Sequence, residues 1–434
     1  MTGRALALAM VPVALLLAAT AAGGLVGVAV AAVVVLMLAC VVDHQLAPGA
    51  GQWQVRREHE AALSIGVGNR LDLIVASQSR HPTTALVRDE IAPELRPDPA
   101  VFRARIAGWG SFRCRTTLTP SRRGRYPLGR VVLRAAGPLG LWTRQVRLAC
   151  PGELRVYPDL TLVRSWDTSS RRGDPLLPGL RRARRADPGL EFRGVREHAD
   201  GDDLRLVNWR ASARLGRLMT TEHQPERSQT VWVLVDCGRV MQGGIDGLQK
   251  LDHACNAALL FIHVALAGGD RVGVLAFADR VGAVLPPRPG HAQFRRALDA
   301  LYALQPASVE SDPASALARW RRLQGRRALC VLFTDLADAS GAERLAPAVA
   351  GIQPRHVALV VTQRDPALGR AAWAPPTDLA AVQLRAAALA AIADRTAALE
   401  TLRRLGILTL DSTQPALAPA VVNRYLELKA RSRL

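Results

Sequence analysis

The second half of the sequence alternates short apolar runs with amphipathic stretches, and this alternation constrains the fold more than any other feature. Residues 231–235 form a continuous β-branched and aromatic run without polar alternation, as in a strand that is buried on both faces of a parallel sheet. Similar runs follow at 272–277, 328–334, 357–362 and 407–410, and helical spacing occurs at 248–267, 292–304, 314–323, 342–350, 378–404 and 416–430. The pattern predicts a doubly wound α/β domain over residues 229–434, with helices on both faces of a parallel sheet.

Two aspartates directly follow strands of this predicted sheet. Asp236 comes after the run 231–235, and Asp335 comes after the run 328–334. In open α/β sheets, ligands and partners bind at the carboxyl ends of the strands. Both aspartates are therefore candidate site residues.

Residues 50–160 have a different period. Apolar and polar residues alternate at 71–77, 102–108, 112–120, 128–135, 143–150 and 153–158, with glycine and proline between the stretches. Several short strands at this spacing predict an antiparallel β-sandwich of immunoglobulin-like size. We expect Arg103, Arg105, Arg113 and Arg115 on the solvated face of its strands.

The N-terminal segment predicts a membrane anchor. No charged residue occurs between positions 5 and 42, a length that would form a helix of about 57 Å. One crossing of the hydrocarbon core needs only about 20 residues. Gly23 and Gly24 lie near the middle of the run, where a tight turn would fall. We therefore predict a transmembrane helical hairpin over residues 1–44.

A cleaved signal peptide that starts at Arg4 is the alternative, and the second apolar run would then still anchor the chain. The positive-inside rule places Arg56 and Arg57 in the cytoplasm. This predicts an inner-membrane protein whose bulk faces the cytoplasm and which contacts membrane lipid through the hairpin.

Residues 161–188 are rich in arginine, proline and glycine, which indicates an extended linker. A docking arm for lipid headgroups or for a partner is compatible with the same composition. The net charge of +20 does not by itself indicate nucleic acid, because the arginines are spread among acids and only Lys250 and Lys429 are lysines. Basic residues also favour the anionic inner leaflet.

The motifs of common active sites are missing. Neither lysine stands in a Gly-Lys-Ser/Thr sequence, and neither H-E-x-x-H nor G-x-S-x-G occurs. The six cysteines have no zinc spacing and are expected to be free thiols. Cys114 and Cys150 could pair if their domain faced outward. We predict no catalytic residue and no small-molecule substrate, and hence a non-enzymatic protein.

Residues 189–228 interleave acids and arginines at very short range. The segment is either a structural clamp of paired charges, with Trp209 packed between domains, or a recognition surface whose arginines bind carboxylates of a partner. The candidate partner-binding residues are Arg196, Asp202, Asp203, Arg205, Trp209, Arg210 and Arg214.

The run REHADGDDLRLVNWRASAR, followed by VWVLVDCGRVM, resembles the bacterial domain of unknown function family 58, which carries a von Willebrand factor A-like domain. RRGRYPLG, GPLGLW and ELRVYP within residues 122–158, and VVNRYLELKARSRL at 421–434, match as well. This chain has Ala136 where the family pattern carries an acid before GPLGLW.

The resemblance implies a metal-ion-dependent adhesion site, in which D-x-S-x-S, a threonine and a later aspartate hold Mg²⁺ and a partner's carboxylate completes the shell. Asp236 and Asp335 match the two aspartates. Gly238 and Val240 stand at the serine positions without a side-chain oxygen, and Ser308 or Ser311 stands near the threonine position. The site is thus degenerate, and the alternative is that the aspartates cap loops or pair with arginines such as Arg239.

Members of the family are linked to MoxR-type AAA+ ATPases. The resemblance therefore implies a membrane-anchored adaptor that acts with such an ATPase in the assembly or activation of protein complexes. One alternative is an extracytoplasmic adhesion or envelope-binding protein. Another is a metal-dependent hydrolase that uses Asp236 and Asp335.

Overall fold

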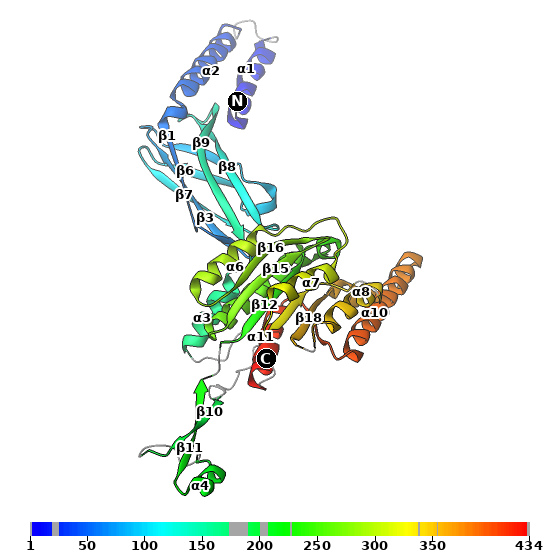
Figure 1. Cartoon of the computed structure of the whole chain (residues 1–434). Helices are drawn as coiled ribbons and strands as arrows, with labels where there is room; N and C mark the ends of the chain where they lie inside the picture. The colour runs from blue at the N-terminus through cyan, green and yellow to red at the C-terminus, as the bar shows by residue number, and fades with distance from the viewer. Residues whose placement is uncertain are drawn as a thin grey trace. The chain divides into compact units, whose positions relative to one another are not determined.

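The computed structural model describes residues 2–19, 26–172, 190–199, 207–225, 228–336, 339–353 and 355–431 (Figure 1). The chain forms two compact units, Met1–Tyr157 and Pro158–Leu434.

Two apolar helices begin the first unit, α1 (Gly3–Ala19) and α2 (Val26–Leu46). They pack against each other, and most of their large apolar side chains are exposed. Helix α2, with a mean hydropathy of 2.7, is long and apolar enough to cross a membrane, whereas α1 is shorter. Both helices occupy the predicted apolar segments. Residues 20–25, where we predicted the turn at Gly23 and Gly24, lie outside the described residues.

Two sheets follow in the first unit. One has the order β1 (Trp53–His59), β3 (Asn69–Ser77), β7 (Ser111–Leu118), β5 (Pro97–Asp98). The other has the order β2 (Leu63–Ser64), β9 (Thr143–Tyr157), β8 (Gly124–Ala136), β4 (Thr83–Asp89), β6 (Val101–Ile106).

The two sheets pack face to face as the predicted sandwich. Val75 of the first sheet shares one hydrophobic core with Val87 and Leu133 of the second. The alternate residues point to solvent, and Arg103, Arg105, Arg113 and Arg115 are all exposed, as expected. The period-two pattern therefore identified the correct faces of these strands.

The turn 137–142 between β8 and β9 holds the end of α2. The buried carboxylate of Asp43 accepts hydrogen bonds from the backbone N–H groups of Leu139, Leu141 and Trp142, each at 2.7 Å. A Cβ at Gly137 would overlap this carboxylate, so the turn requires glycine there. Asp43 was not singled out from the sequence, although GPLGLW was.

The same turn also holds the start of α1. Thr2 Oγ1 donates a hydrogen bond to the carbonyl oxygen of Gly140 at 2.7 Å, and the backbone N–H of Thr2 donates to the carbonyl oxygen of Leu141 at 3.0 Å. Helix α1 therefore begins, and α2 ends, at one turn of the sandwich.

The second unit is built on a six-stranded sheet with the order β16-β15-β12-β17-β18-β19. The five parallel strands are β15 (Arg271–Phe277), β12 (Thr230–Asp236), β17 (Leu329–Phe333), β18 (Val357–Arg364) and β19 (Leu408–Thr413). The antiparallel edge strand β16 (Val281–Arg288) was not predicted. It contains Pro286 and Pro287, which an edge strand tolerates but which argue against a strand in a sequence pattern.

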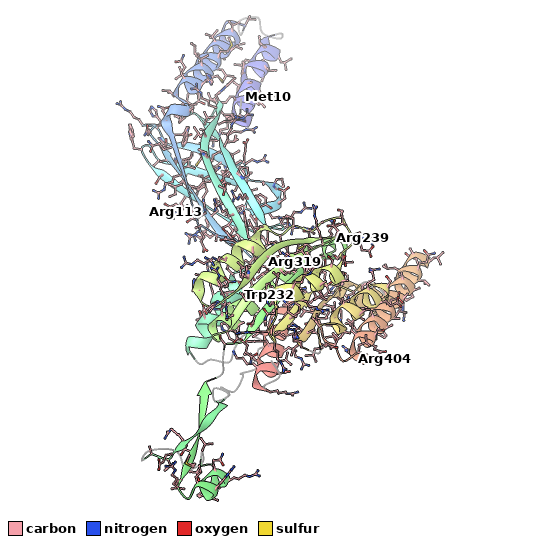
Figure 2. All side chains as sticks on the ribbon, viewed as in Figure 1. Met10, Arg113, Trp232, Arg239, Arg319 and Arg404 are labelled. Carbon is pink, nitrogen blue, oxygen red and sulfur yellow. The ribbon has the colours of Figure 1, made fainter. Side chains whose placement is uncertain are left out.

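Strand β12 is buried on both faces, as its apolar run predicted. Val231, Val233 and Val235 belong to one hydrophobic core, and Trp232 and Leu234 belong to a second. Figure 2 shows Trp232 within the body of this unit.

Helices cover both faces of the sheet. The core on one side contains side chains of α5 (Lys250–Ala267), α6 (His291–Ala303) and α11 (Leu417–Ala430). The core on the other side contains side chains of α7 (Pro313–Leu323), α8 (Ala339–Ala350) and α10 (Leu379–Arg404). The doubly wound arrangement agrees with the predicted alternation.

The predicted linker at 161–188 begins as a helix, α3 (Thr161–Arg172), so the extended reading of that part is wrong. Leu162, Val163 and Trp166 stand at helical spacing and pack on the core that contains α5. Asp167 Oδ1 lies 2.6 Å from His263 Nε2 of α5. Residues 173–189 lie outside the described residues.

The remaining elements are short, and none of them was predicted. Strands β10 (Leu190–Glu197) and β11 (Met219–Pro225) pair antiparallel, and α4 (Trp209–Leu215) lies between them in the chain. Strands β13 (Gly244–Ile245) and β14 (Leu248–Gln249) form a small hairpin before α5. Helix α9 (Pro366–Trp373) precedes α10 and packs against it.

Candidate functional site

Asp236 lies buried at the carboxyl end of β12, and its carboxylate is fully engaged. Oδ1 accepts hydrogen bonds from the backbone N–H of Gly238 at 2.8 Å and from the hydroxyl of Ser311. Oδ2 accepts a hydrogen bond from Thr334 Oγ1 at 2.7 Å. Burial raises the pKa of Asp236 above its ordinary value, and the charge of Asp335 adds to this, although the three hydrogen bonds favour the ionised form.

The two hydroxyls beside Asp236, those of Ser311 and Thr334, come from distant parts of the chain and not from the positions that follow β12. A Cβ at Gly238 would overlap Ser311 Oγ, so the side chain of Ser311 occupies the space that a serine at 238 would need. Ser308, the other predicted loop serine, is exposed and accepts a hydrogen bond from Gln242 Nε2 at 2.9 Å. Of the two predicted loop serines, only Ser311 reaches Asp236.

Asp335 lies beside two cationic side chains. Its Oδ2 accepts a hydrogen bond from Lys250 Nζ at 2.5 Å, and its Oδ1 accepts one from Arg395 Nη1 at 2.6 Å. The carboxylate is buried and both cations are mostly buried. Lys250 is the first residue of α5, and Arg395 lies within α10. Neither had been predicted as a site residue.

The ion pairs continue to β19. Arg395 Nη2 donates to Asp411 Oδ1 at 2.7 Å, and Arg364 Nη2 donates to Asp411 Oδ2 at 3.0 Å. Burial raises the pKa of Asp411, but the hydrogen bond and charge of Arg395 outweigh it, so this pKa lies below its ordinary value. Lys250, Asp335, Arg395 and Asp411 together form what we term the edge network. It joins α5, the end of β17, α10 and β19.

A small pocket opens next to Asp236 and Asp335. Its volume is about 110 Å³, below the roughly 300–1,000 Å³ of typical small-molecule sites. Arg239 and the exposed ion pair between Arg344 and Glu310 (2.6 Å) also line it, and Figure 2 labels Arg239 at the edge of the unit. The pocket is too small for an organic cofactor.

The residues at this edge do not fit a divalent cation. Mg²⁺ prefers octahedral oxygen ligands that include carboxylates, but Asp335 is already neutralised by Lys250 and Arg395. No group of three His, Cys, Asp or Glu residues in the described part of the chain could hold a metal ion. The ammonium group of Lys250 and the guanidinium of Arg395 provide the positive charge that a metal ion would otherwise bring.

Four of the predicted partner-binding residues can be placed. Arg196 is exposed on β10 and donates to the carbonyl oxygen of Glu197 at 3.0 Å. Arg210 and Arg214 are exposed on α4, and Trp209 is 68% exposed. The structural clamp and the recognition surface therefore both stay predictions. The other three, Asp202, Asp203 and Arg205, lie outside the described residues.

An exposed apolar surface on α10 was missed in the sequence. Leu379, Val382 and Leu389 are exposed and stand at spacings of three and seven, which places them on one side of the helix. We term these three residues the outer apolar stripe. Leu379 is 73% exposed, and Trp373 at the end of α9 is 78% exposed.

The outer apolar stripe faces away from the core. The buried residues of α10, Ala388, Ala398, Leu399 and Leu402, stand on the other side of the helix. Figure 1 shows α10 on the outer side of α8. The only charge from position 379 to 388 is Arg385. The sequence therefore contained a signal for an exposed apolar surface, because apolar residues occur on both sides of the first turns of this helix with only one charge among them.

Residues 194–389 match the family model described as "Protein of unknown function DUF58". The match contains Asp236, Asp335 and the outer apolar stripe. Uncharacterized protein Rv1480 of Mycobacterium tuberculosis (strain ATCC 25618 / H37Rv) is 28% identical over 193 residues, which are 44% of this chain and 57% of the relative. Uncharacterized protein YeaD of Bacillus subtilis (strain 168) is 24% identical over 263 residues, 59% of this chain and 62% of the relative. The chain thus spans less than two thirds of these curated relatives.

Two solved structures are similar to parts of the chain. The conserved hypothetical protein BatB from Bacteroides thetaiotaomicron has 13% identity and a TM-score of 0.32, over 47% of this chain and 100% of that one. The vWF domain of the type V pili tip protein Mfa5 from Porphyromonas gingivalis has 15% identity and a TM-score of 0.22, over 25% and 38%. Likenesses at this level carry no functional assignment.

Proposed function

Because residues 194–389 of this chain carry a DUF58 domain, whose function the family description leaves open, we propose that the chain is a membrane-anchored, non-enzymatic protein-interaction protein. Its partner-binding surface is the outer apolar stripe of α10 together with Trp373. The exposed apolar surface is the observation that carries this proposal. Contiguous apolar patches on a protein surface mark interaction sites more often than scattered single residues do.

The geometry of the stripe suits a partner with an apolar groove. A helix that presents anchors at spacings of three and seven binds by laying that side into a complementary groove. Full burial of each leucine or valine would contribute about 1.5–3 kcal/mol relative to exposure. The stripe and Trp373 can therefore supply most of the affinity of a transient complex, without help from charged contacts.

The edge network supports this function by fixing the helix that presents the stripe. Arg395 lies on α10 and bridges Asp335, just beyond the end of β17, and Asp411 of β19. Lys250 pairs with the second oxygen of Asp335, and Arg364 pairs with the second oxygen of Asp411. The charged groups at the sheet edge thus pair with one another and hold α10 against the sheet. We assign them a structural role and not a catalytic one.

Membrane anchoring rests on α1 and α2. Because α1 starts and α2 ends at the turn 137–142, the two helices run away from the sandwich and back to it, as a transmembrane hairpin would. Their exposed leucines and valines would then face lipid. The positive-inside rule places Arg56 and Arg57, which follow the hairpin, on the cytoplasmic side of the membrane. The outer apolar stripe would then lie in the cytoplasm as well.

The partner class comes from the resemblance stated above, which implies a MoxR-type AAA+ ATPase. A cytoplasmic, membrane-held chain with an apolar helical surface is suited to bind such an ATPase and to direct it to protein complexes at the membrane. The adaptor would contribute the recognition and the location, and the ATPase would contribute the energy for assembly or activation.

Co-purification from native membranes tests this proposal. Leu379→Glu places a charge in the outer apolar stripe, and Leu384→Glu makes the same change at a 62% exposed position on the other side of α10. We expect the wild type and Leu384→Glu to recover the same AAA+ ATPase, and Leu379→Glu to lose it. Equal recovery by all three chains would show that the stripe is not the binding surface, and no AAA+ protein with any chain would refute the partner.

A further inference from the structure

A second pocket opens at the amino edge of the sheet of the second unit, where α7 ends before β17 and where the chain enters β18. It is an open pocket of about 550 Å³. The residues of interest among those that line it are Arg321, Arg322, Gln324, Gly351, Arg355 and His356. It lies at the end of the strands opposite to Asp236 and is separate from the edge network.

The three arginines of this pocket have no counter-charge in the described structure. Arg321, Arg322 and Arg355 make no side-chain hydrogen bond or ion pair with any described residue. The stretch 313–334 contains five arginines and no acid. A guanidinium stays charged in proteins. All three side chains are exposed, and an anion held between them would lower the repulsion that remains after screening by water and salt.

His356 contributes a buried polar atom to the same place. It is 6% exposed, and its ring lies 4.7 Å from the ring of Trp320. His356 Nδ1 has no hydrogen-bond partner among the described residues, and an unsatisfied buried polar atom of this kind is uncommon in folded proteins. Burial lowers the pKa of His356, and the nearby charges of Arg355 and Arg321 lower it further. Burial and the positive field of the two arginines therefore both disfavour the protonated imidazole.

Helix ends explain only part of this arrangement. Arg321 and Arg322 stand in the last turn of α7, where basic residues interact favourably with the helix dipole. That effect accounts for neither Arg355 nor the unsatisfied nitrogen of His356. It also requires no pocket. A ligand that is anionic and can form several hydrogen bonds accounts for all of these features together.

We propose that this pocket binds a phosphate dianion, carried by a small phosphomonoester or by a lipid headgroup. Guanidinium groups pair with phosphate oxygens through two parallel hydrogen bonds, and three of them match a group that has several charged oxygens. A single carboxylate would satisfy fewer of these donors. Because His356 Nδ1 has almost no exposed surface in the unbound chain, its hydrogen bond to the remaining phosphate oxygen requires a small movement of the ring.

Equilibrium binding of inorganic phosphate to the detergent-solubilised full chain, measured by titration calorimetry, tests the proposal. The double variant Arg321→Gln/Arg355→Gln removes two pocket charges. Arg319→Gln removes the same charge from an exposed position of the same helix that does not line the pocket (Figure 2). We expect the double variant to bind phosphate roughly tenfold or more weakly, and the Arg319 variant to change the affinity by less than about twofold.

A third variant tests the histidine. His356→Phe keeps an aromatic ring against Trp320 and removes the nitrogen, and it should weaken phosphate binding without lowering the thermal midpoint. Vesicles distinguish a lipid headgroup from a small phosphomonoester as the source of the phosphate. If the site binds a lipid headgroup, vesicles with phosphatidic acid will compete with inorganic phosphate, and phosphatidylcholine vesicles will not. No phosphate binding to the wild type, or an equal loss in Arg319→Gln and the double variant, would overturn the proposal.

Discussion

Arg395 Nη1 lies 2.6 Å from Asp335 Oδ1, and this contact ties the helix that carries the outer apolar stripe to the carboxyl edge of the sheet. Asp335, which the sequence suggested as a metal ligand, instead connects α10 to the end of β17 through this ion pair. Arg395 and the stripe belong to one helix, α10, so a change in the network should alter how the stripe is presented.

Arg395→Met should destabilise the second unit by about 2–4 kcal/mol, because it leaves two mostly buried carboxylates with one cationic partner each. We expect faster amide hydrogen exchange in α10 and a lower thermal midpoint. Arg344→Gln is the matched control, since its ion pair with Glu310 is exposed and should contribute less than about 1 kcal/mol. Similar effects of the two variants would contradict the structural role of the network.

Gly238→Ser, which restores a serine of the adhesion-site motif, should destabilise the protein by about 1–3 kcal/mol. The new Cβ would displace Ser311 Oγ from Asp236. Ser311→Ala in the same chain removes the overlapping atom, and we expect part of the thermal stability to return. If Gly238→Ser leaves the thermal stability unchanged and Mg²⁺ stabilises this variant, the conclusion that this edge does not fit a metal ion is wrong.

Asp236 should make the stability depend on pH. Burial raises its pKa in the folded chain above the unfolded value of about 3.9, so protonation as the pH falls through the folded-state pKa stabilises the folded form. The wild type should therefore gain thermal stability relative to Asp236→Asn between neutral pH and about pH 4. A difference in midpoint that stays constant over this range would show that Asp236 is not perturbed.

The membrane topology should place the C-terminus in the cytoplasm. A fluorescent protein fused after Leu434 should be fluorescent in cells, and alkaline phosphatase fused at the same residue should be inactive, because the phosphatase folds only outside the cytoplasm. The reverse result would exclude a cytoplasmic ATPase as partner. It would also make the extracytoplasmic adhesion alternative the better account and allow a bond between Cys114 and Cys150, which are free in this structure.

The sequence predicted what depends on periodicity. The run 231–235 has one apolar side chain after another, and its residues do enter two cores on opposite faces of the sheet. The alternation in 112–120 placed Arg113 and Arg115 on the exposed face. Asp236 and Asp335 could be placed at one sheet edge because parallel strands end on the same side.

What depends on long-range packing could not be predicted. Lys250, Arg395 and Asp411 are distant in the chain, and only the folded sheet brings their side chains to Asp335 and to one another. Gly238 had been interpreted as a missing ligand, whereas the structure shows that Ser311 fills its place. Leu379 and its neighbours were assigned to an ordinary helix of the domain, because a sequence pattern does not show where the core ends.

Site-specific photocrosslinking in living cells tests the central claim most directly. A photoreactive amino acid at position 379 reports what contacts the outer apolar stripe, and the same amino acid at position 384 is the control on the other side of α10. We predict that position 379 crosslinks to an AAA+ ATPase and that position 384 does not. Crosslinks from position 379 to lipid alone, to a second copy of the chain alone, or to no molecule at all would contradict the account.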